Sequence, residues 1–307
     1  MPFVQAKCPE CGGMLAVDDS KKAAMCQFCG EAFIVQEAVI NNNTYNTYDN
    51  RTTHNYGEGA VVNVYEDKSK DFVIEGGVLK EYHGESLTPV IPEGVVAIGG
   101  NVFENSMITS VTFPSTLKEF QRKGGGTGPF YGCKYLKEVI LPEGLEEISD
   151  KAFYECVGLV SVKIPDSVRS IGAYAFSGCA NLASITIPDS VTSIGSNVFS
   201  RCTSLSSVFI SENLSFIGHS AFSGCTSLAS ITIPNSVMDM GIHVFEECTN
   251  LKNVNIPISL LIKSRFAFPN DLFMKIIKEY NVCQHCGGTF KGLFSSKCSS
   301  CGKPKDY

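Results

Sequence analysis

The sequence of 307 residues contains no tryptophan, and charged residues make up only 18% of it. No stretch approaches the roughly 18 apolar residues that a membrane-spanning helix requires. The net charge is −6, so the chain lacks the excess of positive charge that is typical of general nucleic-acid binders. The first residues, MPFVQAKCPECGG, contain no apolar core of a secretory signal. These absences predict a folded cytoplasmic protein in which thiols stay reduced.

Cysteine, in contrast, is abundant, and eight of the 14 cysteines form CxxC pairs, two pairs near each end of the chain. Each pair directs two thiolates towards one point, and two pairs supply the four soft ligands that tetrahedral Zn²⁺ prefers. Redox-active dithiols are the alternative, but they require a βαβ pattern that neither end shows. We therefore predict two structural zinc sites, each with a short β-hairpin between its two pairs. Their ligands are Cys8, Cys11, Cys26 and Cys29, and Cys283, Cys286, Cys298 and Cys301.

The other six cysteines recur every 23 residues, which is a structural period rather than a metal-ligand spacing. A phenylalanine stands three residues before each of them and a leucine three residues after. A strand-like segment and a proline follow, as in Ile185-Thr186-Ile187-Pro188. A fixed period of this length with an L-x-x-[IV]-x-[IV] core is typical of leucine-rich repeats. The six cysteines are Cys133, Cys156, Cys179, Cys202, Cys225 and Cys248.

The repeat L-x-x-[IV]-x-[IV]-P-x-S-V-x-x-I-G-x-x-x-F-x-x-C resembles the BspA-like leucine-rich repeat family over about residues 72–269. The resemblance implies an α/β repeat fold, a solenoid of about 23-residue units, here with a small zinc ribbon at each end. Members of this family are often surface proteins that contact host or matrix proteins. This chain departs from that pattern because it has no export signal in its first residues and carries thiolate zinc motifs.

One repeat cannot bury its apolar side chains alone, so stacked repeats are expected to align phenylalanine, leucine and isoleucine in continuous ladders. The period of two in a strand sends Ile185 and Ile187 inward and Ser184 and Thr186 outward. Proline then ends the strand, and the phenylalanine segment forms a short helix or a turn. Cys179 and its equivalents are expected to fill the inside of that turn as small apolar side chains.

The pattern divides the chain into five parts. Residues 72–82 read as a β-hairpin around Gly76-Gly77 that covers the first repeat. An apolar stripe predicts a capping helix with Asn270 as its N-cap. Residues 41–59 are rich in Asn, Thr and Tyr, which favours a polar linker over a self-associating β-arm. The predicted parts are a zinc ribbon (1–38), a linker (39–71), the solenoid with its hairpin (72–269), a helix (270–280) and a second zinc ribbon (281–307).

The sequence contains no catalytic constellation, so we expect no enzymatic activity and no small-molecule substrate. The motifs H-E-x-x-H and G-x-S-x-G are absent. The glycine-rich insertion at residues 124–128 lacks the Lys-Ser/Thr of a phosphate-binding loop. His219 and His243 fall in adjacent repeats but at different positions. Acidic residues follow several prolines, as at Asp166 and Asp189, and a solvated turn is favoured there over a calcium site.

The outward strand positions are mostly hydroxyl side chains, with Ile140 and Phe209 as apolar exceptions. An exposed aromatic residue on a polar sheet is a typical anchor for a partner. The alternative is that neighbouring side chains cover Phe209, or that it is simply exposed. The leading hypothesis is a non-enzymatic protein-interaction scaffold. Its candidate contact residues are Ile140, Lys163, Ser184, Thr186, Phe209 and Thr232.

Nucleic-acid binding through residues 281–307 is the alternative hypothesis, beside surface adhesion. This segment has four lysines and one acidic residue, a net charge of +3, whereas residues 1–37 have three lysines and five acidic residues, a net charge of −2. Phe290 and Phe294 offer rings for base stacking, although packing around a metal site is the favoured role. No membrane partner is expected.

Overall fold

The computed structural model describes residues 71–121 and 126–283, together with Cys298, Ser300, Cys301 and Lys303. Before residue 71 it describes the backbone of six strands. The chain divides into two units, Met1–Lys68 and Ser69–Tyr307, which are treated separately below. None of the helices in the described ranges is long and apolar enough to cross a membrane.

The described strands of the first unit form three antiparallel pairs. The first two pairs flank one CxxC motif each, whereas the sequence predicted a hairpin between the motifs. The third pair lies within residues 39–71, for which the composition predicted a linker. The four cysteines of this unit, and the rest of residues 41–59, lie outside the described residues. The pairs are β1 (Phe3–Lys7) with β2 (Met14–Asp18), β3 (Ala23–Met25) with β4 (Ala32–Ile34), and β5 (Thr52–Asn55) with β6 (Val61–Val64).

The second unit begins with the expected hairpin, in which β7 (Phe72–Glu75) pairs antiparallel with β8 (Val78–Tyr82). Gly76 and Gly77 have φ values of +56° and +79°, a left-handed conformation that glycine adopts without strain. Strand β8 then pairs in parallel with the first solenoid strand and so covers the open end of the repeat stack.

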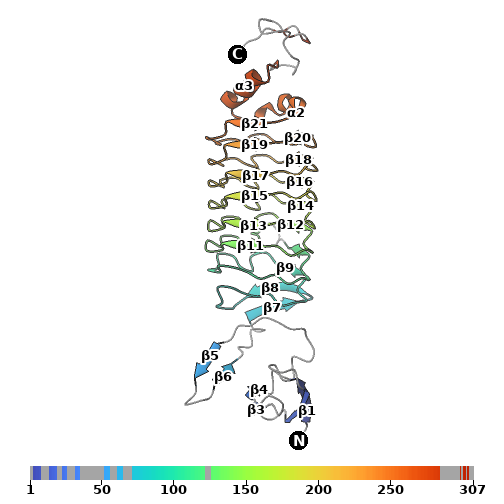
Figure 1. The fold of residues 1–307 in the computed structure, drawn as a ribbon, viewed down its shortest axis with the longest axis vertical. Coiled ribbons are helices and arrows are strands. Elements are labelled where there is room, and N and C mark those ends of the chain that lie inside the picture. The colour runs from blue at the N-terminus through green and yellow to red at the C-terminus, as the bar shows by residue number, and fades with distance from the viewer. Residues whose placement is uncertain are drawn as a thin grey trace. The chain divides into compact units, whose positions relative to one another are not determined.

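After the hairpin the chain winds into a solenoid, and its turns stack along one axis (Figure 1). Each complete turn contributes a strand to each of two faces, and paired residues of successive complete repeats are 23 apart, as Ser170 and Ser193 are. The first strand face consists of β11 (Glu138–Ile140), β13 (Ser161–Lys163), β15 (Ser184–Thr186), β17 (Ser207–Phe209), β19 (Ser230–Thr232) and β21 (Asn253–Asn255).

The second strand face is one nine-stranded sheet that runs from β7 to β20, and its strands are parallel from β8 onward. The glycine that follows many of its strands, as at Gly195, lets adjacent turns approach closely, since an added Cβ there would lie 2.7 Å from the Ala173 nitrogen. Its remaining strands are β9 (Ala97–Ile98), β10 (Glu119–Phe120), β12 (Glu147–Ile148), β14 (Ser170–Ile171), β16 (Ser193–Ile194), β18 (Phe216–Ile217) and β20 (Asp239–Met240).

A continuous stack of phenylalanine rings runs through the centre of the solenoid. Neighbouring ring centroids are 5.1–5.8 Å apart and the ring planes differ by only 3–24°. Tyr82 of the hairpin extends the stack at one end, at 5.1 Å from Phe103. The ladder that the 23-residue period predicts is therefore confirmed. Its rings belong to Phe103, Phe130, Phe153, Phe176, Phe199, Phe222, Phe245 and Phe268.

The six periodic cysteines form a second ladder beside the rings, and all six are buried. Each Sγ donates a hydrogen bond to a phenylalanine carbonyl of the preceding turn, as Cys179 does to Phe153 at 3.2 Å. The carbonyl lies 26 residues earlier for five of the cysteines and 30 residues earlier for Cys133, whose turn carries the glycine-rich insertion. The six Sγ–O distances lie between 2.9 and 3.2 Å. Cysteine therefore fills the turn, as predicted, and also connects each turn to the one before it.

The phenylalanine segment forms a turn rather than a helix. Its backbone is left-handed one residue before each cysteine and, from the turn of Cys156 onward, also five residues before it. At the position immediately before the cysteine, glycine alternates with larger residues from one turn to the next, from Gly132 to Glu247. A Cβ added to Gly178 would lie 3.1 Å from the Cγ of Glu155, so the absent side chain leaves room for the one before it. The residues at this position are Asn105, Gly132, Glu155, Gly178, Arg201, Gly224 and Glu247.

The C-terminal end of the stack is covered by α2 (Ile258–Lys263), a 3-10 turn, η2 (Arg265–Ala267), and α3 (Asn270–Glu279). The sequence predicted α3 but not α2, which replaces the strand of a further repeat. The prediction of Asn270 as N-cap is wrong. Pro269 takes that position because its carbonyl accepts the first helical hydrogen bond, from the Phe273 nitrogen at 2.9 Å.

We predict that replacing a central ring of the stack destabilises the solenoid strongly. Phe176 is fully buried between Phe153 and Phe199, so Phe176→Ala removes two ring contacts and is expected to lower the free energy of unfolding by about 3–5 kcal/mol. Urea denaturation followed by circular dichroism measures the change. The exposed Ser184→Ala serves as control and is expected to change it by less than about 0.5 kcal/mol. Equal stability of the two variants would contradict the role given to the stack.

Candidate interaction surface and metal centre

The first strand face has the inward and outward directions that the period of two predicts. In β15 Ile185 is buried while Ser184 and Thr186 are exposed, and β11, β19 and β21 repeat the same alternation. The outward column formed by the third residue of each strand is exposed throughout. All six candidate contact residues lie on this face and are exposed: Ile140, Lys163, Ser184, Thr186, Phe209 and Thr232.

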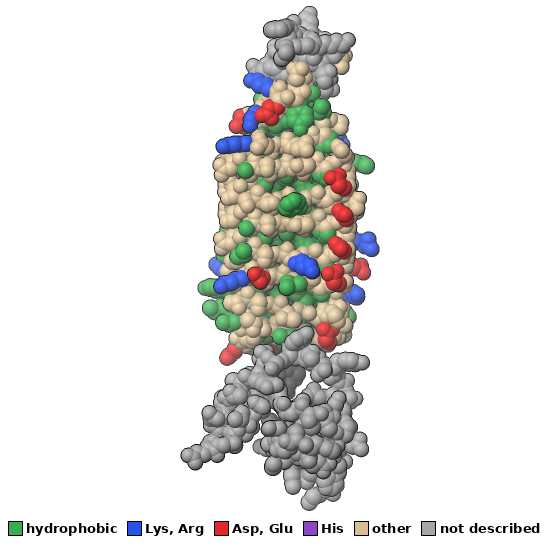
Figure 2. Space-filling model, viewed as in Figure 1, with side chains coloured by type: hydrophobic (Ala, Val, Ile, Leu, Met, Phe, Trp, Pro, Cys, Tyr) green, Lys and Arg blue, Asp and Glu red, His purple; other side chains and the backbone are tan. Residues whose placement is uncertain are grey.

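Two large apolar side chains stand out of this polar surface. Phe209 is 66% exposed and Ile140 is 68% exposed, so neighbouring side chains do not cover them. Phe209 is the register partner of Thr186, and Ile140 is that of Lys163. Threonine is too short to shield a phenyl ring on the adjacent strand, which explains the exposure. Figure 2 shows isolated hydrophobic side chains on an otherwise polar face of the solenoid.

An open groove of about 600 Å³ lies beside Phe209 and spans three successive turns. Its apolar lining includes Ile164, Ile187 and Ile210, the residues that follow strands β13, β15 and β17. Phe209, Thr186 and Lys163 line it from the strand side, and Asp166 and Asp189 line it from the loops after the prolines. Sequence reasoning identified the strand residues but missed the groove, because it depends on how three separate turns align.

Four acidic residues on consecutive turns form an acidic ridge along this edge: Glu143, Asp166, Asp189 and Glu212. All four side chains are exposed, and Figure 2 shows a column of acidic side chains along the solenoid. Across the described parts of the chain, the ion pairs involve other carboxylates. The ridge therefore presents net negative charge next to the groove, where Lys163 is the opposing charge.

Three of the four predicted ligands of the second zinc site converge in the structure. The Sγ atoms of Cys283, Cys298 and Cys301 all lie within 4.8 Å of one another, and those of Cys283 and Cys301 are 3.6 Å apart. Cys283 follows shortly after α3. The adjacent Val282 is fully buried in the solenoid core and its nitrogen donates to the carbonyl of Ile277 in α3, which holds Cys283 in place. Cys286 lies outside the described residues. Three convergent thiols match the soft ligands that zinc prefers, so the donor set fits this metal.

The cysteines of the ladder are poor candidates for chemistry. Burial raises the pKa of Cys202 and of Cys248 to about 12, and it also raises the pKa of Cys156, Cys179 and Cys225. The thiolate is the nucleophile and the metal ligand, so these thiols are inert at neutral pH. The ladder cysteines each bond to a backbone carbonyl, whereas the thiols of Cys283, Cys298 and Cys301 converge on one another.

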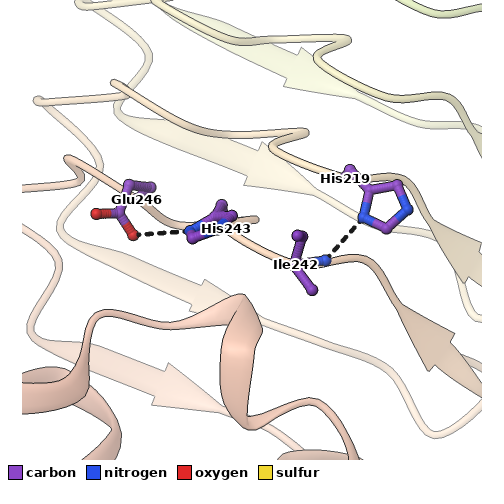
Figure 3. Close-up of polar contacts among 4 residues, drawn as sticks. All are labelled: His219, Ile242, His243 and Glu246. Carbon is purple, nitrogen blue, oxygen red and sulfur yellow. Dashed lines mark hydrogen bonds and ion pairs between the residues drawn. The ribbon is translucent and has the colours of Figure 1, made fainter.

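The histidines of adjacent turns do not form a site together (Figure 3). His219 accepts a hydrogen bond at Nδ1 from the Ile242 nitrogen at 2.9 Å, which ties one turn to the next. The Nδ1 of His243 lies 3.4 Å from Oε2 of Glu246 in its own turn. Both rings therefore serve local contacts, in keeping with the different positions they occupy in the repeat.

A family model described as "BspA type Leucine rich repeat region" matches six copies over residues 96–205 and 123–252. The comparison with curated proteins finds no match. A leucine-rich repeat protein of T. pallidum is 28% identical, with a TM-score of 0.54, over 61% of this chain and 91% of that chain. One from Bacteroides ovatus is 30% identical, with a TM-score of 0.37, over 56% of this chain and 55% of that chain.

We predict that alkaline pH destabilises the solenoid through the cysteine ladder. Folding raises the pKa of Cys202 from 9.0 to about 12, so its contribution is fully present below pH 9 and is lost as the pH rises towards 12. At about pH 10.5 this thiol alone accounts for a loss of about 2 kcal/mol relative to neutral pH. Urea unfolding at both pH values measures it, with Cys202→Ala as the comparison because lysine and tyrosine also titrate. Equal losses in both proteins would contradict the prediction.

Proposed function

Because the chain belongs to the BspA-type leucine-rich repeat family, we propose that it is a non-enzymatic protein-interaction scaffold. The observation that carries the proposal is Phe209, a ring that is 66% exposed on a strand face of otherwise mostly polar residues. Ile140 adds a second apolar contact three turns away, with Lys163 and Thr186 between them. A rigid stack of turns holds these side chains at fixed spacing, as an interface requires.

The energetics favour a protein partner at this surface. Burying an aromatic side chain at the centre of an interface contributes more than most other contacts, and such residues dominate binding energy. The surrounding serine and threonine side chains carry no charge, so a partner covers them without desolvating ions. Phe209 and Ile140 are therefore the expected anchors, and the hydroxyl-rich positions form the polar rim.

We further propose that each cluster of four CxxC cysteines holds one structural zinc ion. Support comes from the converging thiols of Cys283, Cys298 and Cys301. At this end Cys286 would complete the tetrahedral set, and Cys8, Cys11, Cys26 and Cys29 would form the other. Bound zinc would cross-link the short segments that carry these cysteines.

Nucleic-acid binding by residues 281–307 and surface adhesion stay hypotheses, as does the cytoplasmic location. Of the four lysines that favour nucleic-acid binding, only Lys303 belongs to the described residues. No contact within the described residues favours either alternative over the protein scaffold.

We predict that the double variant Phe209→Ala/Ile140→Ala loses partner capture. The full-length tagged protein is used as bait, and captured proteins are quantified by mass spectrometry. A specific partner is expected to fall by about tenfold or more, since anchor residues at hot spots contribute at least about 2 kcal/mol. Phe216→Ala, which removes a ring that is 39% exposed on the second strand face, is the matched control. Capture unaffected by the double variant would remove the first strand face from the proposal.

We predict about two zinc ions per chain by elemental analysis of protein purified without chelator. Cys298→Ser and Cys8→Ser are each expected to lower the content to about one zinc ion. Cys179→Ser, in the ladder, is the control and leaves the zinc content unchanged. In the native protein the six ladder thiols should react with a thiol reagent only after denaturation. Zinc content that is insensitive to Cys298→Ser would contradict the C-terminal site.

A further inference from the structure

The groove beside Phe209 combines three features that together restrict what it can bind. Its lining is apolar at Ile164, Ile187 and Ile210, its strand side carries the exposed ring, and its loop side carries Asp166 and Asp189. Ile164 and Ile187 are 8% and 2% exposed, so the Phe209 ring, at 66%, offers most of the accessible apolar surface of this open groove. Such a ring beside an apolar groove floor favours the burial of an aliphatic side chain.

The acidic ridge favours a ligand of positive charge. Successive turns of a parallel stack are about 4.8 Å apart, so its four carboxylates repel one another at close spacing. Within the described residues none of the four carboxylates forms an ion pair, because the lysines and histidines that pair do so elsewhere. Lys163 contributes one positive charge to the groove, whereas Asp166 and Asp189 contribute two negative charges. The site therefore attracts cations and disfavours nucleic acid and acidic peptides.

The dimensions of the ridge fit a short extended segment. The three spacings of about 4.8 Å between four successive turns add up to about 14 Å, which is the length of about four extended residues. Side chains of an extended chain alternate in direction, so every second one enters the apolar lining while those between them reach the carboxylates. Lysine and arginine have stems long enough to reach the ridge while their aliphatic part lies over the ring.

We infer that the groove between Phe209 and the acidic ridge binds an extended polypeptide segment in which basic and aliphatic residues alternate. This inference rests on the proposed function, and it adds the chemistry of the partner: a basic segment docks across the turns of residues 143–212. The aliphatic side chains provide affinity through the apolar lining, and the basic ones provide selection through the ridge.

The experiment measures the fluorescence anisotropy of a labelled peptide of about eight residues, in which arginine alternates with leucine, upon addition of the full-length protein. Two further peptides replace arginine with glutamate or leucine with serine. Asp166→Asn/Asp189→Asn removes two charges of the ridge without changing side-chain size, and Phe209→Thr gives the residue found at neighbouring positions of the column. Glu146→Gln/Glu147→Gln and Phe216→Thr make the same changes on the second strand face.

The arginine–leucine peptide is expected to bind, and more weakly as salt is added. The Asp166→Asn/Asp189→Asn variant should weaken binding by about fivefold and Phe209→Thr by a similar factor, while the two controls change it by less than about twofold. Equal weakening by Glu146→Gln/Glu147→Gln would show attraction by net charge alone and overturn the inference. Binding of the glutamate peptide, or of the serine peptide at full affinity, would also overturn it.

Failure of this inference is distinguishable from failure of the proposed function. If none of the peptides binds but Phe209→Ala/Ile140→Ala still abolishes partner capture, the basic chemistry is wrong and the interaction surface stands. If capture and peptide binding are both indifferent to Phe209, neither proposal survives. Circular dichroism of each variant checks the fold, which substitutions of exposed side chains are expected to preserve.

Discussion

The stack of phenylalanine rings is the interaction on which the rest of the solenoid depends. Each ring lies between those of the turns before and after it, and each cysteine thiol reaches back to a phenylalanine carbonyl of the preceding turn. The ring stack and the thiol hydrogen bonds therefore each fix the same register between successive turns. The two strand faces follow from that register, because residues 23 apart must then lie side by side.

A stack of this kind is stabilised only by contacts between neighbours, so its two ends need separate solutions. At one end Tyr82 and β8 continue the ring stack and the sheet. At the other, Phe268 supplies the last ring, and Lys263 covers the open edge by donating to the Met238 carbonyl and pairing with Asp239. Lys263 stands 23 residues after Met240, at a position that carries an apolar residue in the preceding repeats, and it lies at the end of α2 instead of in a strand.

The 23-residue period was sufficient to predict the ring ladder, the buried cysteines and the exposed strand positions, because each depends on one repeat and its neighbours. Helix α2 was not predictable from the period, since it arises where Lys263 replaces isoleucine and the pattern ends. The groove was not predicted for another reason. Taken singly in the sequence, Asp166 and Asp189 are typical of solvated turns. Only their alignment beside Phe209 across three turns gives them a common surface.

The contrast between inward and outward residues of the repeat explains which positions are able to vary with function. Inward positions are held by the ring and thiol ladders, so a change there affects every neighbouring turn. Outward positions are not constrained by packing, and serine or threonine at most of them is compatible with any turn. Ile140, Lys163 and Phe209 depart from that pattern, although the inward residue of each of their strands is the same, a valine. Departures that the fold does not require are the positions where selection by a partner is the simplest explanation.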